Sequence, residues 1–196
     1  MVLALKRCAR NLGVPADIVM LTAICVAISH LEETGVVTLV LVVPLRDGPA
    51  EQDVVGLLAD FRVMQVACEG LSVAGVALQL HSVVKERQWQ APGLTAQYDW
   101  PFVNFQWTDV EAHHGFEQVV DLSHNTERLR NPLGIAVEQR DAHFWRLRTS
   151  FDKRRYNAEA RQRYQKGLIA ALEAFLVDPL APAWLPTDST SSGRQS

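Results

Sequence analysis

An apolar helix followed by an apolar strand, near the start of the chain, constrains the fold more than any other part of the sequence. Residues 36–43 (VVTLVLVV) are β-branched and continuously apolar, and Pro44 ends the run. Such a run is typical of a strand that is covered on both faces. The preceding segment, from Pro15 to Glu33, has apolar residues on nearly every side, which is typical of a buried helix, and we expect Gly35 to end it. A central strand next to a buried helix is therefore predicted.

The later elements predict an α/β protein. Apolar residues at helical spacing predict an amphipathic helix over residues 73–86, with Gln79, Lys85 and Glu86 facing solvent. Alternating or apolar patterns predict strands at Phe61–Ala67, Pro101–Trp107, Phe116–Leu122, Ile135–Gln139 and Phe144–Asp152. Because helices alternate with strands early and strands dominate the middle, we expect a two-layer or three-layer sandwich with a mixed β-sheet.

A last helix and a polar tail close the chain. Asn157 can cap a helix that ends near Asp178-Pro179. Its apolar stripe consists of Tyr164, Leu168, Ala171, Leu172 and Phe175. From Pro186 the tail TDSTSSGRQS has no core-forming residues, so we expect one lobe over residues 1–185 and disorder over 186–196.

Composition excludes some functions and favours a location. The 196 residues include 19 basic and 22 acidic side chains, a net charge of −3, without a Lys/Arg cluster that could follow a phosphate backbone, so nucleic acid is excluded as a partner. The longest apolar run, Ile18–Ile28, is too short to span a bilayer, and no signal peptide is indicated. Cys8, Cys25 and Cys68 are scattered among apolar neighbours, as buried thiols are in a reducing compartment. We therefore expect a cytoplasmic protein without a membrane partner.

Four passages, in this order and spacing, resemble a known family. The first, ALKRCARNLGVPADIVMLTAICVAISHLEETG, is similar to a helix pair with the sequence motifs "LA..LGVT" and "YTG". VVTLVLVVPLRDGPAEQDVVGLLADFRVMQV is similar to a strand, a "GRxRPE" loop and "VGxFVNTLPLRV", and YDWPFVNFQW to "NPLFQVMF". FWRLRTSFDKRRYNAEARQRYQKGLIAALEAFLVDP is similar to "LEYDTDLFDxxTIxRLxxHFxxLLEAxLADP". Over residues 3–179 the chain thus resembles the C-terminal lobe of nonribosomal peptide synthetase condensation domains, of the chloramphenicol acetyltransferase-like superfamily.

The resemblance implies chemistry that this sequence does not carry by itself. Condensation domains use an HHxxxDG motif in the N-terminal lobe, whose second histidine helps an acceptor amine attack a carrier-bound thioester. The closest passage here is HHGFEQV, in which Gln118 and Val119 replace the aspartate and the glycine. We therefore expect the chain to correspond to the part that follows the histidine lobe. The resemblance implies no directly bound cofactor, only phosphopantetheine on a partner carrier protein.

Four residues are candidates for contact with the carrier protein or the substrate. Asp60 replaces the asparagine of "FVNT", and Gln88 is retained in RQWQAPG, which corresponds to the family's "HQDxPFE" loop. The resemblance implies that Asp60, Gln88, Asn104 and Arg148 face the carrier protein or the substrate channel.

The histidines and Cys25 have simpler interpretations than catalysis or metal binding. His113 and His114 are candidates for a catalytic histidine, but two solvated turn histidines explain them. Adjacent histidines without a third ligand do not indicate a metal site. His124 with Asp121 could be a dyad, but a polar turn explains both residues. Cys25, inside an apolar helix, indicates packing rather than a nucleophile.

A basic face is predicted near the end of the strand block. It consists of Arg146, Arg148, Lys153, Arg154 and Arg155. The simpler interpretation is a solvated strand edge protected by charge. The alternative is a surface that meets an acidic carrier protein or a phosphopantetheine phosphate.

Three functional hypotheses follow. The chain is the C-terminal half of a condensation-type acyltransferase of secondary metabolism, for example antibiotic biosynthesis. It would be inactive alone and need an N-terminal lobe for amide or ester formation. Alternatively, it is a non-catalytic binding module that recruits a carrier protein or a tailoring enzyme. In the third hypothesis a homo-oligomer builds the active site between identical subunits, which would require His113 or His114.

Overall fold

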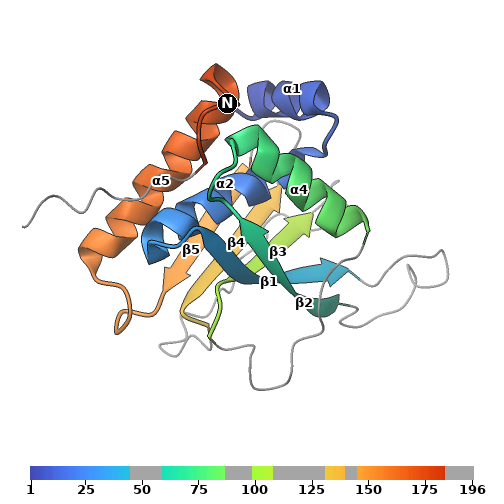
Figure 1. The fold of residues 1–196 in the computed structure, drawn as a ribbon. Helices are drawn as coiled ribbons and strands as arrows, with labels where there is room; N and C mark the ends of the chain where they lie inside the picture. The colour runs from blue at the N-terminus through green and yellow to red at the C-terminus, as the bar shows by residue number, and fades with distance from the viewer. Residues whose placement is uncertain (45–58, 87–98, 108–130, 140–144, 184–196) are drawn as a thin grey trace, which may run out of the picture. The chain divides into compact units, whose positions relative to one another are not determined.

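The structure is a computed structural model that describes residues 1–44, 59–86, 99–107, 131–139 and 145–183. These residues form helices and strands in the order α1 (Val2–Leu12), α2 (Ala16–Glu32), β1 (Val36–Pro44), β2 (Ala59–Ala67), α4 (Val73–Lys85), β3 (Phe102–Trp107), β4 (Leu133–Gln139), β5 (Trp145–Phe151) and α5 (Ala158–Val177) (Figure 1). The predicted α/β class is confirmed. The predicted strand at residues 116–122 and the predicted disordered tail at 186–196 lie outside the described residues.

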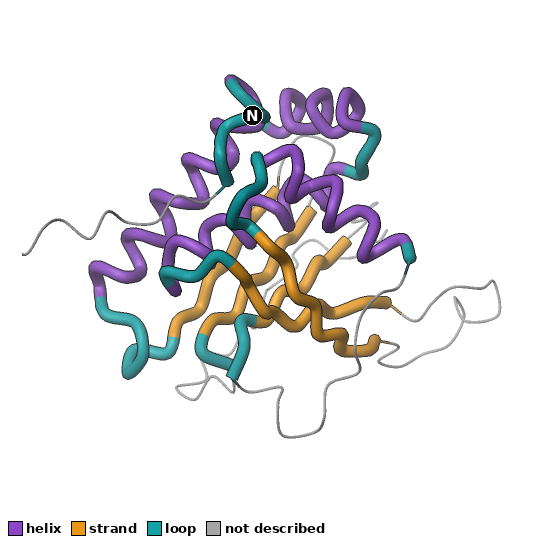
Figure 2. The backbone as a smooth tube through the Cα atoms, viewed as in Figure 1, coloured by secondary structure: helices purple, strands orange, loops and turns teal. Residues whose placement is uncertain are grey.

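The described strands form a single mixed sheet. Its order is β2-β1-β3-β4-β5, and Figure 2 shows the strands side by side. β1 pairs with β3 and β3 with β4 in parallel, whereas β4 and β5 are antiparallel. Leu39 and Val40, which are adjacent in β1 and so point to opposite faces, are 0% and 2% exposed. The prediction of an interior strand covered on both faces is therefore confirmed.

The described chain divides into two compact units. A sheet unit contains Met1–Ala4, Thr38–Gln65 and Val83–Ala158, and a helical unit contains Leu5–Val37, Val66–Ser82 and Glu159–Ser196. The single lobe over residues 1–185 stays a prediction.

Two helices of the helical unit pack closely. α2 is buried along nearly its whole length, as predicted, and the predicted apolar stripe of α5 is buried. A Cβ atom at Gly167 of α5 would lie 3.5 Å from the Cα atom of Ala27 in α2, so the small residue lets the helix backbones approach. Among the described residues no single helix is long and apolar enough to cross a membrane, although α1 and α2, bent by 101°, meet that test of length and composition as a pair.

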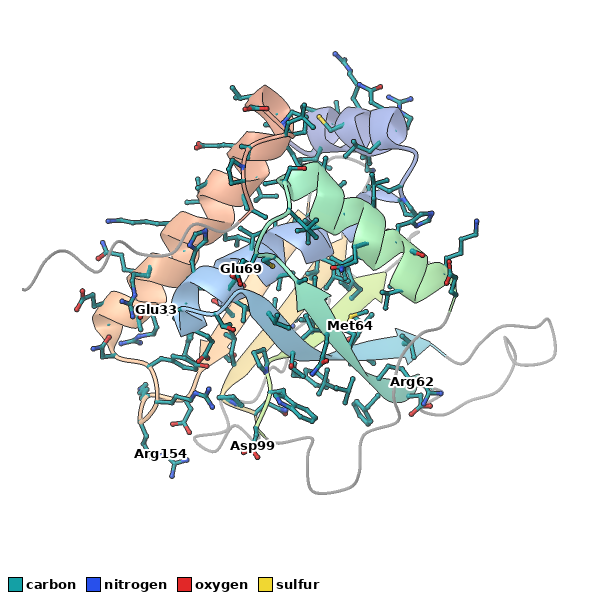
Figure 3. The ribbon with its side chains drawn as sticks, in the orientation of Figure 1. Glu33, Arg62, Met64, Glu69, Asp99 and Arg154 are labelled. Atoms are coloured by element: carbon teal, nitrogen blue, oxygen red, sulfur yellow. The ribbon has the colours of Figure 1, made fainter. Side chains whose placement is uncertain are left out.

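The end of α2 corrects the expectation for Gly35. The left-handed residue at the helix end is Glu33, with φ of 52°, and its N–H donates to the carbonyl oxygen of Ser29. Gly35 is required for space instead, since a Cβ atom there would lie 2.6 Å from the Cβ of Glu69, which Figure 3 labels. The backbone N–H groups of Cys68 and Glu69 donate to the Gly35 carbonyl oxygen at 2.8 and 3.0 Å. The prediction that Gly35 ends the helix was therefore wrong.

α4 is anchored at its start by the segment that follows α5. The N–H groups of Val73 and Ala74, in the first turn, donate to the carbonyl oxygens of Ala181 and Pro179 at 3.0 and 2.8 Å. Helix-start N–H groups have no partner inside their own helix, so these carbonyls act as a cap from a distant part of the chain.

Gln79 of α4 corrects a second expectation. It was predicted to face solvent, but it is half-buried and its side-chain oxygen accepts the N–H of Ala67 at 3.2 Å. Ala67 is the last residue of β2, so this hydrogen bond links the end of the strand to helix α4. An amide side chain suits this position because it satisfies a backbone group where the strand pairing stops.

The buried thiols belong to the helical unit. Cys25 and Cys68 are both 0% exposed, and neither forms a disulfide. Burial raises the pKa of Cys25 well above its ordinary value and raises the pKa of Cys68 to about 11, although a hydrogen bond with Ser29 acts in the opposite direction on Cys68. Both thiols are therefore protonated at neutral pH, which agrees with the interpretation of Cys25 as packing.

Candidate functional site

The strand registers divide the side chains of β3, β4 and β5 between two faces of the sheet. Directly paired residues point to the same face, and successive residues alternate. One face carries Val103, Ile135 and Val137, which are at most 2% exposed. The other face carries Asn104, which pairs with Ala136, which in turn pairs with Arg148. We call this second side of β3, β4 and β5 the open face.

The open face is partly exposed and lined by small side chains at its centre. Phe102 pairs with Gly134, and Gly134 pairs with Ser150, so these three residues form a second row beside the first. Ser150 is exposed, and Asn104, Ala136 and Arg148 are half-buried. Glycine, alanine and serine leave room above the strands, so the face can accommodate another molecular surface or an extended chain.

A buried carboxylate anchors the charged end of this face. The side chain of Glu138 is 7% exposed and forms ion pairs with Arg148 and, at 4.0 Å, with Arg146. Arg146 lies directly opposite Glu138 in the β4–β5 register, and Arg148 lies two residues further along β5, opposite Ala136. Two guanidinium groups against one carboxylate leave a net positive charge, and the ion pair with Glu138 orients the Arg148 side chain.

A basic turn with several internal hydrogen bonds follows β5. The carboxylate of Asp152 accepts the backbone N–H, the Nε–H and an Nη2–H of Arg154, at 2.9, 3.2 and 3.0 Å. These hydrogen bonds lower the pKa of Asp152 and raise the pKa of Arg154. Both residues are charged at neutral pH, and Figure 3 shows Arg154 on this turn.

The structure brings together only some of the residues predicted to face a carrier or channel. Asn104 and Arg148 share one row of the open face, separated by Ala136. Asp60 lies on β2, at the other edge of the sheet, where it forms an ion pair with Arg62 and accepts the N–H of Phe61 at 2.7 Å. The ring of Phe61 lies 5.8 Å from that of Phe102, a residue of the open face, so the neighbouring Asp60 points to the opposite face.

The remaining candidates lie outside the described residues. These are Gln88, His113, His114, Asp121 and His124. Within the described ranges no group of three or more histidine, cysteine or acidic side chains is arranged to hold a metal ion.

Sequence patterns did not single out Glu138 or Asp152, yet both position arginines of the predicted basic face. A charged residue inside the apolar segment 135–139 was a usable signal for Glu138. Its partners depend on the antiparallel register with β5, which pairs Glu138 with Arg146. That register becomes visible only when both strands are placed.

Comparison with solved structures identifies the fold. The condensation domain of the monacolin K polyketide synthase MokA matches 93% of this chain and 46% of its own length, with a TM-score of 0.70 and 14% sequence identity. The condensation domain that mediates chain release from the enacyloxin polyketide synthase matches 98% of this chain and 40% of its own length, with a TM-score of 0.68 and 13% identity. The chain has a condensation-domain fold.

A further match belongs to the complex of the X-domain and OxyB from teicoplanin biosynthesis, with a TM-score of 0.68 and 11% identity over 92% of this chain and 44% of the solved one. The chain thus spans less than half the length of these solved structures. Neither a comparison with family models nor one with curated proteins found a match to the sequence. The resemblance inferred from the four passages is confirmed at the level of the fold.

Proposed function

We propose that this protein is the C-terminal half of a condensation-type acyltransferase of nonribosomal peptide assembly. In this role the open face forms one wall of the substrate channel, opposite a lobe that carries the HHxxxDG motif. The observation that carries the proposal is the match of nearly the whole chain to less than half of a condensation domain, combined with the partly exposed row Asn104, Ala136 and Arg148. A chain with this fold and this face is suited to pair with a second lobe.

The side chains of this protein suggest which groups each lobe would supply. The complementing lobe supplies the histidine that assists the attacking amine or hydroxyl, and phosphopantetheine on a partner carrier protein presents the acyl group as a thioester. In this chain Asn104 can donate and accept hydrogen bonds, and Arg148, held by Glu138, offers a fixed positive charge. The small residues Gly134 and Ala136 leave room for the substrate chain. The free thiols suit a reducing compartment, so we place this chemistry in the cytoplasm.

Complementation tests the proposal. The purified protein is mixed with an N-terminal lobe that contains HHxxxDG, a loaded donor carrier protein and an acceptor, and the amide or ester product is measured by mass spectrometry. We expect product only when both lobes are present, and none when the second histidine of the motif is replaced by alanine. Absence of both complex formation and product across candidate N-terminal lobes would contradict the proposal.

A binding module without catalysis is the second candidate. It is supported by the match to the complex of the X-domain and OxyB, whose TM-score of 0.68 equals that of the condensation domain from the enacyloxin polyketide synthase. The solved complex contains a second protein, OxyB. This candidate predicts saturable binding of a tailoring enzyme or a carrier protein in the absence of any complementing lobe. Product formation with a complementing lobe distinguishes the two functions, because an acyltransferase half yields product with that lobe and a binding module yields none.

A further inference from the structure

Five cations of the sheet unit lie along one edge of the described sheet. β5 is an edge strand, and Arg146 and Arg148 project from its open face. Lys153, Arg154 and Arg155 follow in the turn after β5 and are exposed. We call these five residues the basic edge.

The charge of the basic edge is opposite to that of the chain. The five cations and their two carboxylate partners, Glu138 and Asp152, leave a local net charge of +3. The whole chain has a net charge of −3. The basic edge is therefore a local excess of positive charge on an acidic chain, and it creates a field that attracts an acidic surface.

The turn holds one cation in a fixed position without burying it. Asp152 binds the Nε–H and one Nη2–H of Arg154, yet the Arg154 side chain remains 83% exposed. A guanidinium group has five N–H donors, so three of them still point to solvent in a fixed geometry. Because the side chain is already ordered, binding a carboxylate there requires a smaller loss of conformational entropy than binding a free arginine.

The neighbouring cation is ordered by an aromatic anchor. The guanidinium of Arg155 lies 5.5 Å from the ring centroid of Tyr156, which is 4% exposed. The Tyr156 ring in turn meets the ring of Phe151 edge-on at 5.7 Å. The turn also closes on itself, since the N–H groups of Arg155 and Tyr156 donate to the Asp152 carbonyl oxygen at 3.1 and 2.9 Å.

We propose that the basic edge is a docking surface for the acidic face of a carrier protein. The inference deepens the proposed function, because it names the surface on which the partner of that function binds. Protection of a strand edge by charge explains Arg146 and Arg148, which lie on β5. It does not explain Lys153, Arg154 and Arg155, which lie beyond the last residue of that strand, Phe151. Charge complementarity explains both groups.

Charge reversal on the turn tests the inference. The probe is an acidic peptidyl carrier protein in its apo form, labelled with a fluorophore, and its Kd is measured by anisotropy over a series of salt concentrations. Lys153→Glu with Arg155→Glu should weaken binding at least about tenfold and reduce the salt dependence, since interface charges govern both. Arg10→Glu with Lys166→Glu changes the total charge equally at two other exposed positions and should leave the Kd unchanged.

Folding and the proposed function are controlled separately. Circular dichroism checks that the charge-reversed variant is folded. A second variant, Lys153→Ala with Arg155→Ala, removes the two positive charges without adding negative ones. Weaker carrier binding by either turn variant supports the inference. Equal binding by both turn variants and the Arg10/Lys166 control overturns it, as does absence of carrier binding by the wild-type protein. Failure of acyl transfer with a complementing lobe, while carrier binding remains sensitive to the turn, counts against the proposed function alone.

Discussion

Replacing Gly35 by alanine should destabilise the protein through a steric conflict with Glu69. The new Cβ would lie 2.6 Å from the Cβ and 2.5 Å from Oε2 of Glu69. Carbon atoms in contact normally lie about 3.5–4.0 Å apart, so one backbone must move by about 1 Å. The Gly35 carbonyl oxygen accepts two N–H groups, at 2.8 and 3.0 Å, which such a movement would lengthen. Overpacking costs about 1–3 kcal/mol and each net hydrogen bond about 1 kcal/mol, so we expect a loss of about 2–4 kcal/mol.

Urea denaturation and two second-site variants make this prediction refutable. Glu69→Ala retains the Cβ at 2.6 Å and should not rescue Gly35→Ala, whereas Glu69→Gly removes that atom and should recover most of the loss. Gly75→Ala is the matched control. A Cβ there would meet the Ser72 Oγ at 3.4 Å, an ordinary contact, within helix α4. A Gly35→Ala protein of wild-type stability, or equal rescue by Glu69→Ala and Glu69→Gly, would refute the reasoning.

Further predictions concern the ionisable groups of both units. Cys68, with a pKa of about 11 against an ordinary 9.0, should react with iodoacetamide at pH 8 about 100-fold more slowly in the native protein than in the unfolded one, as measured by peptide mass spectrometry. Glu138→Ala should cost about 2 kcal/mol in urea denaturation, less than a fully buried pair, because the side chain of its partner Arg148 is 33% exposed, whereas Glu138→Gln should cost less. NMR titration should show Asp152 with a pKa below its ordinary 3.8. The stability from this lowered pKa is present above pH 3.8 and is lost as the pH falls through the folded-state value, and Arg154→Gln should return the pKa towards 3.8.

Elements with strong local patterns were predictable from the sequence. The continuous apolar run of β1, the apolar helix α2 and the stripe of α5 were identified within one or two residues of their bounds. These patterns predict which residues are buried, because burial depends largely on side-chain hydrophobicity. The order of the four resembling passages likewise identified the fold before any strand was placed.

Features that depend on strand register or on a distant backbone were not predictable in this way. The open face exists because Asn104, Ala136 and Arg148 fall in one row, and β3 and β4 are separated by 25 residues along the chain, 108–132. Glu33 rather than Gly35 takes the left-handed conformation at the end of α2, against the usual preference for glycine. The space that Gly35 provides becomes apparent only with Glu69 in position.

A bulky residue at the centre of the open face tests the central claim most directly. Ala136→Trp, compared with Ala170→Trp on the exposed side of α5, is assayed for acyl transfer with a complementing HHxxxDG lobe and a loaded carrier protein. If the open face is the channel wall, Ala136→Trp lowers kcat/KM at least about tenfold while Ala170→Trp retains wild-type transfer, because displacing a bound substrate by about 1 Å is costly. Wild-type transfer by Ala136→Trp would contradict the account.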